Sequence, residues 1–260
     1  SVSRRDDLGD LTQKLIKIPT LNPPGNNYLE ICEYLKIRME KSGFTAKLIR
    51  AYDTPGDSEK FPRWNLVCSR EGGLQGKTVH FNGHTDVVPV GNAESWSVDP
   101  FGAEVKDGYL FGRGATDMKS SVAAFVASAI DFVSKNPPNG SIVITITGDE
   151  EGEAKNGTAA ILDWMQKNNE KISHCLVGEP TCPDYLGEMV KIGRRGSITA
   201  RFCVKGLQGH TAYPQLAINP LNALVQLMHS LSEESLDIGS KHFDASTLVI
   251  TSIDTGNSAT

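Results

Sequence analysis

A histidine and an aspartate stand directly after an apolar, strand-like run, and this placement constrains the fold more than any other feature of the sequence. The run is residues 78–81, and it leads into His84 and Asp86 within the segment GHTDVVP. A strand that ends in this way presents both side chains at its carboxyl end, where open α/β sheets bind ligands. One imidazole nitrogen can then bind a metal while a carboxylate orients the other. Because a lone histidine after a strand is more often structural, a metal site is predicted only if further ligands occur later in the chain.

Three further acidic clusters stand in similar places. One comes after residues 142–147, a β-branched run that is typical of a central buried strand. Another comes after the short apolar run 175–177, and the third precedes a small-residue helix that begins near residue 119. Their carboxylates belong to Asp117, Glu150, Glu151 and Glu179. Since the carboxyl ends of neighbouring strands meet at one edge of a sheet, we expect these groups to share a cleft with His84.

Carboxylates gathered in one cleft repel one another, so the cluster predicts divalent cations that neutralise them. A mixed set of imidazole and carboxylates suits zinc, or related ions such as cobalt or manganese. Asp117 is suited to bridge two such ions. Glu150 and Glu151 are adjacent and point different ways, so one is expected to hold metal and the other to accept a proton from the attacking water. The alternative for this pair is a solvated acidic turn, which the preceding buried strand and the flanking glycines disfavour.

The pattern of elements predicts two domains. Strands and helices alternate up to about residue 181, which indicates an α/β layered domain over residues 1–181. Beyond it, a smaller α+β domain is expected over residues 182–260. In the first domain, helices are expected at 8–16, 28–39, 119–134 and 158–167, and strands at 45–49, 65–69, 79–81, 142–147 and 175–177. In the second, strands are expected at 197–204 and 247–253, around a helix at 220–231.

The composition argues against several classes of protein. Hydrophobic residues make up 39% and charged residues 22%, as in ordinary globular proteins, and no apolar run approaches the length that spans a membrane. A net charge of −5 argues against nucleic acid as a partner. The five cysteines are scattered and form no Cys-x-x-Cys pair. The first residues lack the apolar stretch of a signal peptide, so a cytoplasmic location is expected.

Four motifs together resemble the M20 aminopeptidase-like family of dinuclear-metal amidohydrolases. They are GHTDVVP at 83–89, GRGATDMK at 112–119, GDEE at 148–151 and GEPT at 178–181. The resemblance implies an α/β, three-layer aminopeptidase-like catalytic domain and a smaller ferredoxin-like α+β domain that serves as lid and dimerisation surface. It also implies two zinc ions per subunit, for which cobalt can substitute.

The same resemblance implies roles for individual residues. His84, Asp117 and Glu179 would hold one metal, and Asp117 with Glu151 the second. Glu150 would be the general base, and Asp86 would orient His84. A cis peptide bond after Asp117 is also implied. The remaining histidines match no motif and are expected to be structural or on the surface: His80, His174, His229 and His242.

Within that family, three segments resemble enzymes that hydrolyse the succinyl amide of N-succinyl-LL-2,6-diaminopimelate. The segments are 156–158, 191–197 and 206–214. The alternative is an N-acetyl or other N-acyl amino acid, such as acetylornithine, and the alternative from another class is a metal-binding module without catalysis. The substrate-binding residues implied are Arg194, Ser197 and Tyr213, which suit a carboxylate-bearing acyl group. His210 would reach the partner subunit's site and stabilise the oxyanion, so a homodimer through the smaller domain is expected.

The resemblance also implies one more histidine ligand from a late segment. No motif for it occurs before the chain ends at residues 258–260. The second metal would then have too few protein ligands for a stable zinc site. We therefore expect these 260 residues to be a truncated form that is inactive in isolation and holds the first metal better than the second.

Overall fold

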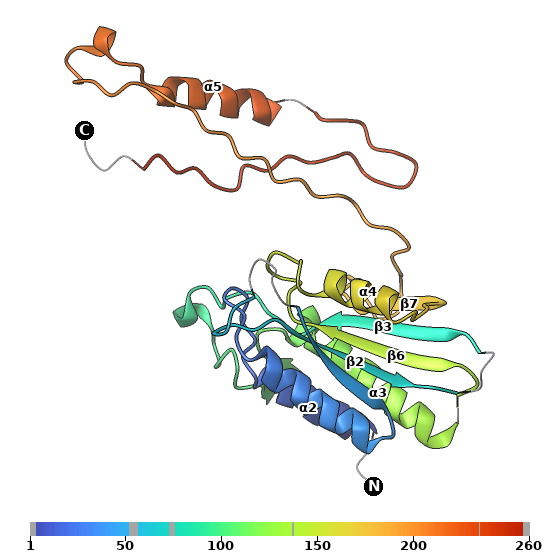
Figure 1. Cartoon of the computed structure of the whole chain (residues 1–260). Coiled ribbons are helices and arrows are strands. Elements are labelled where there is room, and N and C mark those ends of the chain that lie inside the picture. Colours follow the sequence, from blue (N-terminus) through green and yellow to red (C-terminus); the bar gives the residue numbers. More distant parts are fainter. Residues whose placement is uncertain (1–3, 52–56, 73–75, 137, 234, 257–260) are drawn as a thin grey trace. The chain divides into compact units, whose positions relative to one another are not determined.

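The computed structural model describes residues 4–51, 57–72, 76–136, 138–233 and 235–256 (Figure 1). The chain divides into two compact units, residues 1–188 (unit 1) and 189–260 (unit 2). The predicted domain boundary at residues 181 and 182 stays a prediction. The chain end, on which the expectation of a truncated form was based, lies outside the described residues. No helix within the described ranges is long and apolar enough to cross a bilayer.

Unit 1 is built on a five-stranded mixed sheet in the order β1-β2-β6-β3-β7 (Figure 1). Its strands are β1 (Thr45–Arg50), β2 (Trp64–Arg70), β3 (Thr78–His84), β6 (Ser141–Thr147) and β7 (His174–Val177). The three strands β6, β3 and β7 run parallel, and β2 pairs antiparallel with both β6 and β1. All five strands form where the apolar runs predicted them. The β-branched β6 is central and buried, which is where such side chains pack well.

Helices cover both faces of this sheet. They are α1 (Arg4–Ile16), α2 (Tyr28–Lys41), α3 (Ser120–Lys135) and α4 (Thr158–Lys167). Ile144 points to the face where α1, α2 and α3 form the main core, and its neighbour Val143 points to the other face, against Ile161 and Met165 of α4. Because successive side chains of a strand alternate between faces, the two cores make three layers. This confirms the predicted α/β three-layer class.

The connection from β3 to α3 carries a small antiparallel hairpin of β4 (Glu104–Lys106) and β5 (Tyr109–Phe111). Its turn uses Asp107 and Gly108, both with positive φ. A short helical turn, Ala115–Lys119, then leads into α3. The peptide bond between Asp117 and Met118 is cis, as the family resemblance implied.

Unit 2 contains the predicted helix, α5 (Pro220–Glu233). The predicted strands at 197–204 and 247–253 are wrong for the described residues, because neither segment is hydrogen-bonded into a sheet there. A strand needs a partner backbone, and the β-type pairing in the described part of unit 2 is the bridge between Leu207 and Ile218. Alternating polarity alone therefore did not produce strands in these two segments.

Candidate metal centre

The candidate site lies at the carboxyl ends of the three parallel strands. The central strand of the three, β3, ends at His84, which stands in register with Thr147 at the end of β6. The turn after β6 therefore brings Glu150 and Glu151 beside the imidazole, and the segment after β7 brings Glu179 from the other side. Hence the strand order places these side chains together, as the sequence pattern predicted.

The imidazole of His84 lies at the centre of the acidic cluster. Its Nε2 is 3.1 Å from Asp117 Oδ1, 3.5 Å from Glu179 Oε1 and 3.9 Å from Glu150 Oε2. The His84 side chain is 2% exposed, whereas those of Asp117 and Glu150 are 52% and 45% exposed. The histidine is therefore buried, whereas the carboxylates of Asp117 and Glu150 are open to solvent.

The other nitrogen of His84 is fixed by Asp86. Nδ1 is 3.0 Å from the backbone carbonyl oxygen of Asp86 and 3.4 Å from its carboxylate Oδ1. Because a carbonyl oxygen only accepts, Nδ1 carries the proton and Nε2 faces the carboxylates. Burial disfavours the charged imidazole, but the Asp86, Glu179 and Glu150 carboxylates outweigh it and raise the pKa of His84 to about 9.

Two groups of side chains have the geometry to hold a metal ion. One is His84, Glu150 and Glu179, and the other is His84, Asp117 and Glu151; within each group the ligand atoms lie within 4.8 Å of one another. Every predicted ligand belongs to one of these groups. Glu150, predicted as the base, lies in the first group, and Asp117 lies only in the second. The assignment of ligands and base therefore stays a prediction.

The donor set fits a divalent cation. Burial raises the pKa of Glu151, and the charges of Asp117 and Glu150 add to this effect. A cation between these carboxylates would remove the repulsion that disfavours their ionised forms. One imidazole with several carboxylates is a ligand combination that zinc accepts.

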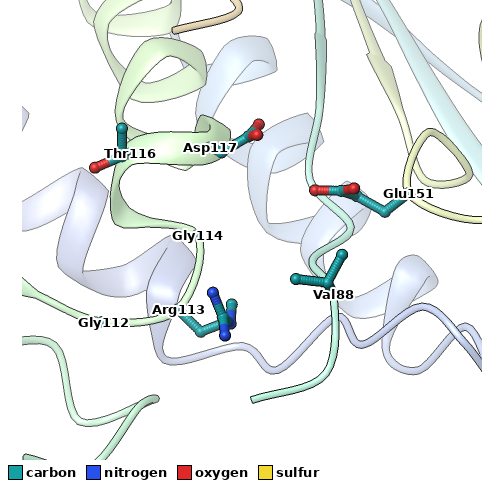
Figure 2. A pocket seen from close by; sticks show the side chains of 7 residues that line it. All are labelled: Val88, Gly112, Arg113, Gly114, Thr116, Asp117 and Glu151. Carbon is teal, nitrogen blue, oxygen red and sulfur yellow. The ribbon is translucent and has the colours of Figure 1, made fainter. Parts of the chain in front are cut away.

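A cavity of about 220 Å³ opens beside the second group (Figure 2). Asp117 and Glu151 stand on its opposite sides, and Arg113 supplies a positive charge at its wall (Figure 2). The Arg113 guanidinium lies over the ring of Trp96, 5.1 Å from the ring centroid, which holds it in place. Sequence reasoning gave no role to Arg113, although it stands inside the GRGATDMK motif.

The predicted substrate-binding residues and His210 all belong to unit 2 and are exposed there. The rings of His210 and Tyr213 are 5.7 Å apart, and the Ala212 backbone N–H donates to His210 Nδ1 at 3.0 Å. His210 and Tyr213 are therefore close to one another in the described structure. The roles of Arg194, Ser197, His210 and Tyr213 stay predictions.

Three buried polar residues to which sequence reasoning gave no role lie near the acidic cluster of unit 1. Asn22 and Asp149 are each 2% exposed and Lys119 is 0% exposed. Burial lowers the pKa of Lys119 to about 7, and its Nζ donates to the Ile18 carbonyl oxygen at 2.8 Å. Asn22 stood in a segment rich in proline and glycine, and nothing in such a segment distinguishes a buried donor from an ordinary turn residue.

The sequence is similar to those of known proteins. The family model for peptidase family M20/M25/M40 matches residues 80–253. A succinyl-diaminopimelate desuccinylase of Cereibacter sphaeroides is 54% identical over 250 residues, which is 96% of this chain and 63% of that protein. The desuccinylase of Ruegeria pomeroyi is 52% identical over 256 residues, covering 98% of this chain and 64% of that protein. The chain thus spans less than two thirds of the length of these relatives.

Solved structures share the fold. A tripeptidase from Staphylococcus aureus matches with a TM-score of 0.55 at 17% identity, over 92% of this chain and 58% of that one. Human carnosine dipeptidase 1 matches with a TM-score of 0.55 at 22% identity, over 66% of this chain and 38% of that one. At such identities the likeness concerns the fold alone.

Proposed function

The chain belongs to peptidase family M20/M25/M40, and from this premise we propose that it acts in a metal-dependent hydrolase of linear amides. The proposed reaction converts N-succinyl-LL-2,6-diaminopimelate and water to succinate and LL-2,6-diaminopimelate, a step of lysine and diaminopimelate biosynthesis. The observation that carries the proposal is the 54% identity to a desuccinylase over 96% of the chain. The cluster of imidazole and carboxylates at the strand ends supplies the chemistry that such a reaction needs.

The proposed cofactor is a pair of zinc ions per subunit, with cobalt as a substitute. His84, Asp117 and Glu179 would hold one ion, and Asp117 and Glu151 would contribute to the other. Zinc supplies a Lewis acid that polarises the amide carbonyl and lowers the pKa of water. With Nδ1 turned to Asp86, the Nε2 of His84 faces the carboxylates, where it would act as a metal ligand once it has lost its proton.

Glu150 is the proposed general base. Its carboxylate is 45% exposed and reaches within 3.9 Å of His84 Nε2, so it borders the place where the reacting groups would meet. In this role it accepts a proton from the attacking water and passes it to the amide nitrogen as the C–N bond breaks.

Recognition of the acyl group is assigned to unit 2. Arg194 and Ser197, with Tyr213, are proposed to bind the succinyl carboxylate, since a guanidinium fork matches two carboxylate oxygens. His210 is proposed to stabilise the oxyanion in the partner subunit's site, which requires a homodimer. A cytoplasmic location remains part of the same proposal.

Substrate preference separates the proposal from its alternative. The purified protein is loaded with zinc and assayed with matched N-succinyl and N-acetyl amino acids, including N-succinyl-LL-2,6-diaminopimelate and acetylornithine. The 260 residues are expected to be inactive in isolation, and where turnover is measured we expect it to be faster with the succinyl substrate. Faster turnover of acetylornithine would assign the protein to the deacetylases instead.

The shared site has its own test. A His210→Ala chain mixed with an Asp117→Ala chain should regain part of the activity. Each heterodimer keeps one complete site, in which the His210→Ala chain supplies Asp117 and the other chain supplies His210. Heterodimers that fold and assemble but stay inactive would contradict the role of His210 in the partner's site.

A further inference from the structure

A single buried amide joins two buried carboxylates beneath the candidate site. Asn22 Nδ2 donates to Asp86 Oδ2 at 2.8 Å and to Asp149 Oδ1 at 3.1 Å. The exposed fractions of Asn22, Asp86 and Asp149 are 2%, 0% and 2%. Both hydrogens of one amide group are therefore used, each on a different carboxylate.

The first carboxylate holds the beginning of the acidic turn. Asp86 Oδ1 accepts the backbone N–H of Glu150 at 3.2 Å, and Asp86 Oδ2 accepts that of Glu151 at 2.9 Å. Asp86 therefore does more than orient His84, because it also fixes the main chain of both glutamates. A shift of this carboxylate would move the glutamate backbone and the histidine together.

The second carboxylate holds the end of the same turn. Asp149 Oδ2 accepts the backbone N–H groups of Lys155 and Asn156 at 3.1 and 2.9 Å. It also accepts the side-chain amide of Asn156 at 3.2 Å. Asp86 and Asp149 thus fasten the two ends of residues 149–156, and Asn22 is the group that links them.

Asn22 is itself held by the strand-end segment. Its backbone N–H donates to the Val87 carbonyl oxygen at 2.9 Å, and the Val87 N–H donates to the Thr20 carbonyl oxygen at 2.9 Å. The packing is close, since a Cβ placed on Gly152 would lie 2.6 Å from Asn22 Nδ2. The amide has little freedom to turn away from its two acceptors.

We propose that Asn22 is a positioning residue that holds the Glu150–Glu151 turn in place through Asp86 and Asp149. A neutral double donor suits this place, because a third carboxylate would repel both neighbours and an apolar side chain would remove one buried hydrogen bond from each. Asn22 acts through other residues and does not itself contact reacting groups. Its role can be tested by hydrogen exchange and by kinetics, and only the kinetic measurement depends on the proposed function.

The first readout is backbone hydrogen exchange, which needs no substrate. In an Asn22→Leu variant, the amides of Glu150 and Glu151 should exchange at least tenfold faster, while the amides of β6 keep their protection. Asn82→Leu is the matched control, since Asn82 of β3 donates to Thr145 Oγ1 at 2.9 Å, a hydrogen bond that involves neither aspartate. Unchanged exchange at Glu150 and Glu151, or equal acceleration throughout unit 1, would overturn the proposal.

An Asn22→Ala variant guards against misfolding of the leucine variant, because its smaller side chain leaves room for water between the carboxylates. The same local acceleration is expected, and protection equal to the wild type would overturn the proposal. In active enzyme, kcat should fall about tenfold or more with KM unchanged. A raised KM with unchanged kcat would contradict a role in holding the base. If the wild type hydrolyses no amide, the exchange result still decides the role of Asn22 separately from the proposed function.

Discussion

The two units of the chain differ in how far their apolar side chains are exposed. In unit 1, Ile144 of β6 is 1% exposed and belongs to a core shared by three helices and the sheet. In unit 2, Ile198 is 95% exposed, and none of the described residues of that unit is buried. Both isoleucines were predicted to lie in strands. The difference shows that a strand-like pattern becomes a strand only where another backbone pairs with it.

The same contrast applies to the candidate site. Most side chains of the acidic cluster come from the ends of strands in a packed sheet, and Asp117 comes from the turn before α3, so their mutual distances are set by the fold. The four predicted site residues of unit 2 are exposed. Among them, the rings of His210 and Tyr213 lie close to one another. The preorganised acidic cluster therefore lies in unit 1, and the contributions proposed for unit 2 are recognition of the acyl group and, through His210, stabilisation of the oxyanion.

The largest expected effect tests whether the chemistry resides in unit 1. Glu150→Gln should lower kcat by roughly 10²–10⁴-fold, because an amide cannot accept the proton of the attacking water. Bound zinc, measured by elemental analysis, should stay unchanged. Activity close to that of the wild type would show that Glu150 is not the base and would reopen its assignment as a ligand.

A matched pair of truncations tests the difference in burial directly. Ile144→Ala should lower the free energy of unfolding by about 2–5 kcal/mol, the usual range for removing a buried isoleucine. Ile198→Ala should change it by less than about 0.5 kcal/mol when measured at a concentration at which the chain is monomeric. Denaturant unfolding of both variants gives the comparison. An equal loss would mean that Ile198 is buried in solution.

Repeating the Ile198→Ala measurement at high protein concentration sharpens the result. If the proposed dimer covers this side chain, the variant should dissociate more readily than the wild type. Unchanged dissociation would place the dimer surface elsewhere in the chain.

Much of unit 1 could be predicted from local signals, and the reasons are physical. The β-branched run at 142–147 predicts a strand and the apolar stripe of 28–39 predicts a helix, and both are present in the structure. His84 and the acidic residues could be grouped because parallel strands end at one edge. Asn22 could not be found, since its two acceptors lie 64 and 127 residues away in the sequence. In unit 2, the described segment 197–204 is not paired in a sheet, and pairing depends on a second backbone segment that no local pattern encodes.

A smaller effect is expected from pH in the metal-free protein. The folded pKa of His84, about 9, lies above its ordinary value of 6.5, so the charged imidazole stabilises the folded state fully below pH 6.5. This contribution should be lost as the pH rises from 6.5 through 9, at about 1.4 kcal/mol per pKa unit as an upper limit. Unfolding of chelator-treated wild type is compared with His84→Gln from pH 6 to 10. A constant difference between the two proteins would contradict the electrostatic description of the site.

The smallest expected effect concerns unit 2 and uses two adjacent arginines as a matched pair. Both Arg194 and Arg195 are exposed, and only Arg194 is proposed to bind the succinyl carboxylate. Arg194→Ala should raise KM for the succinyl substrate roughly 10–100-fold, the equivalent of a lost hydrogen bond between charged groups. Arg195→Ala should leave KM within about twofold. The N-acetyl analogue has no acyl carboxylate, so Arg194→Ala should not raise its KM further. A similar increase in KM for both substrates would show that Arg194 supports the fold of unit 2 and does not bind the acyl carboxylate. The proposal that unit 2 recognises the acyl group through Arg194 would then be wrong.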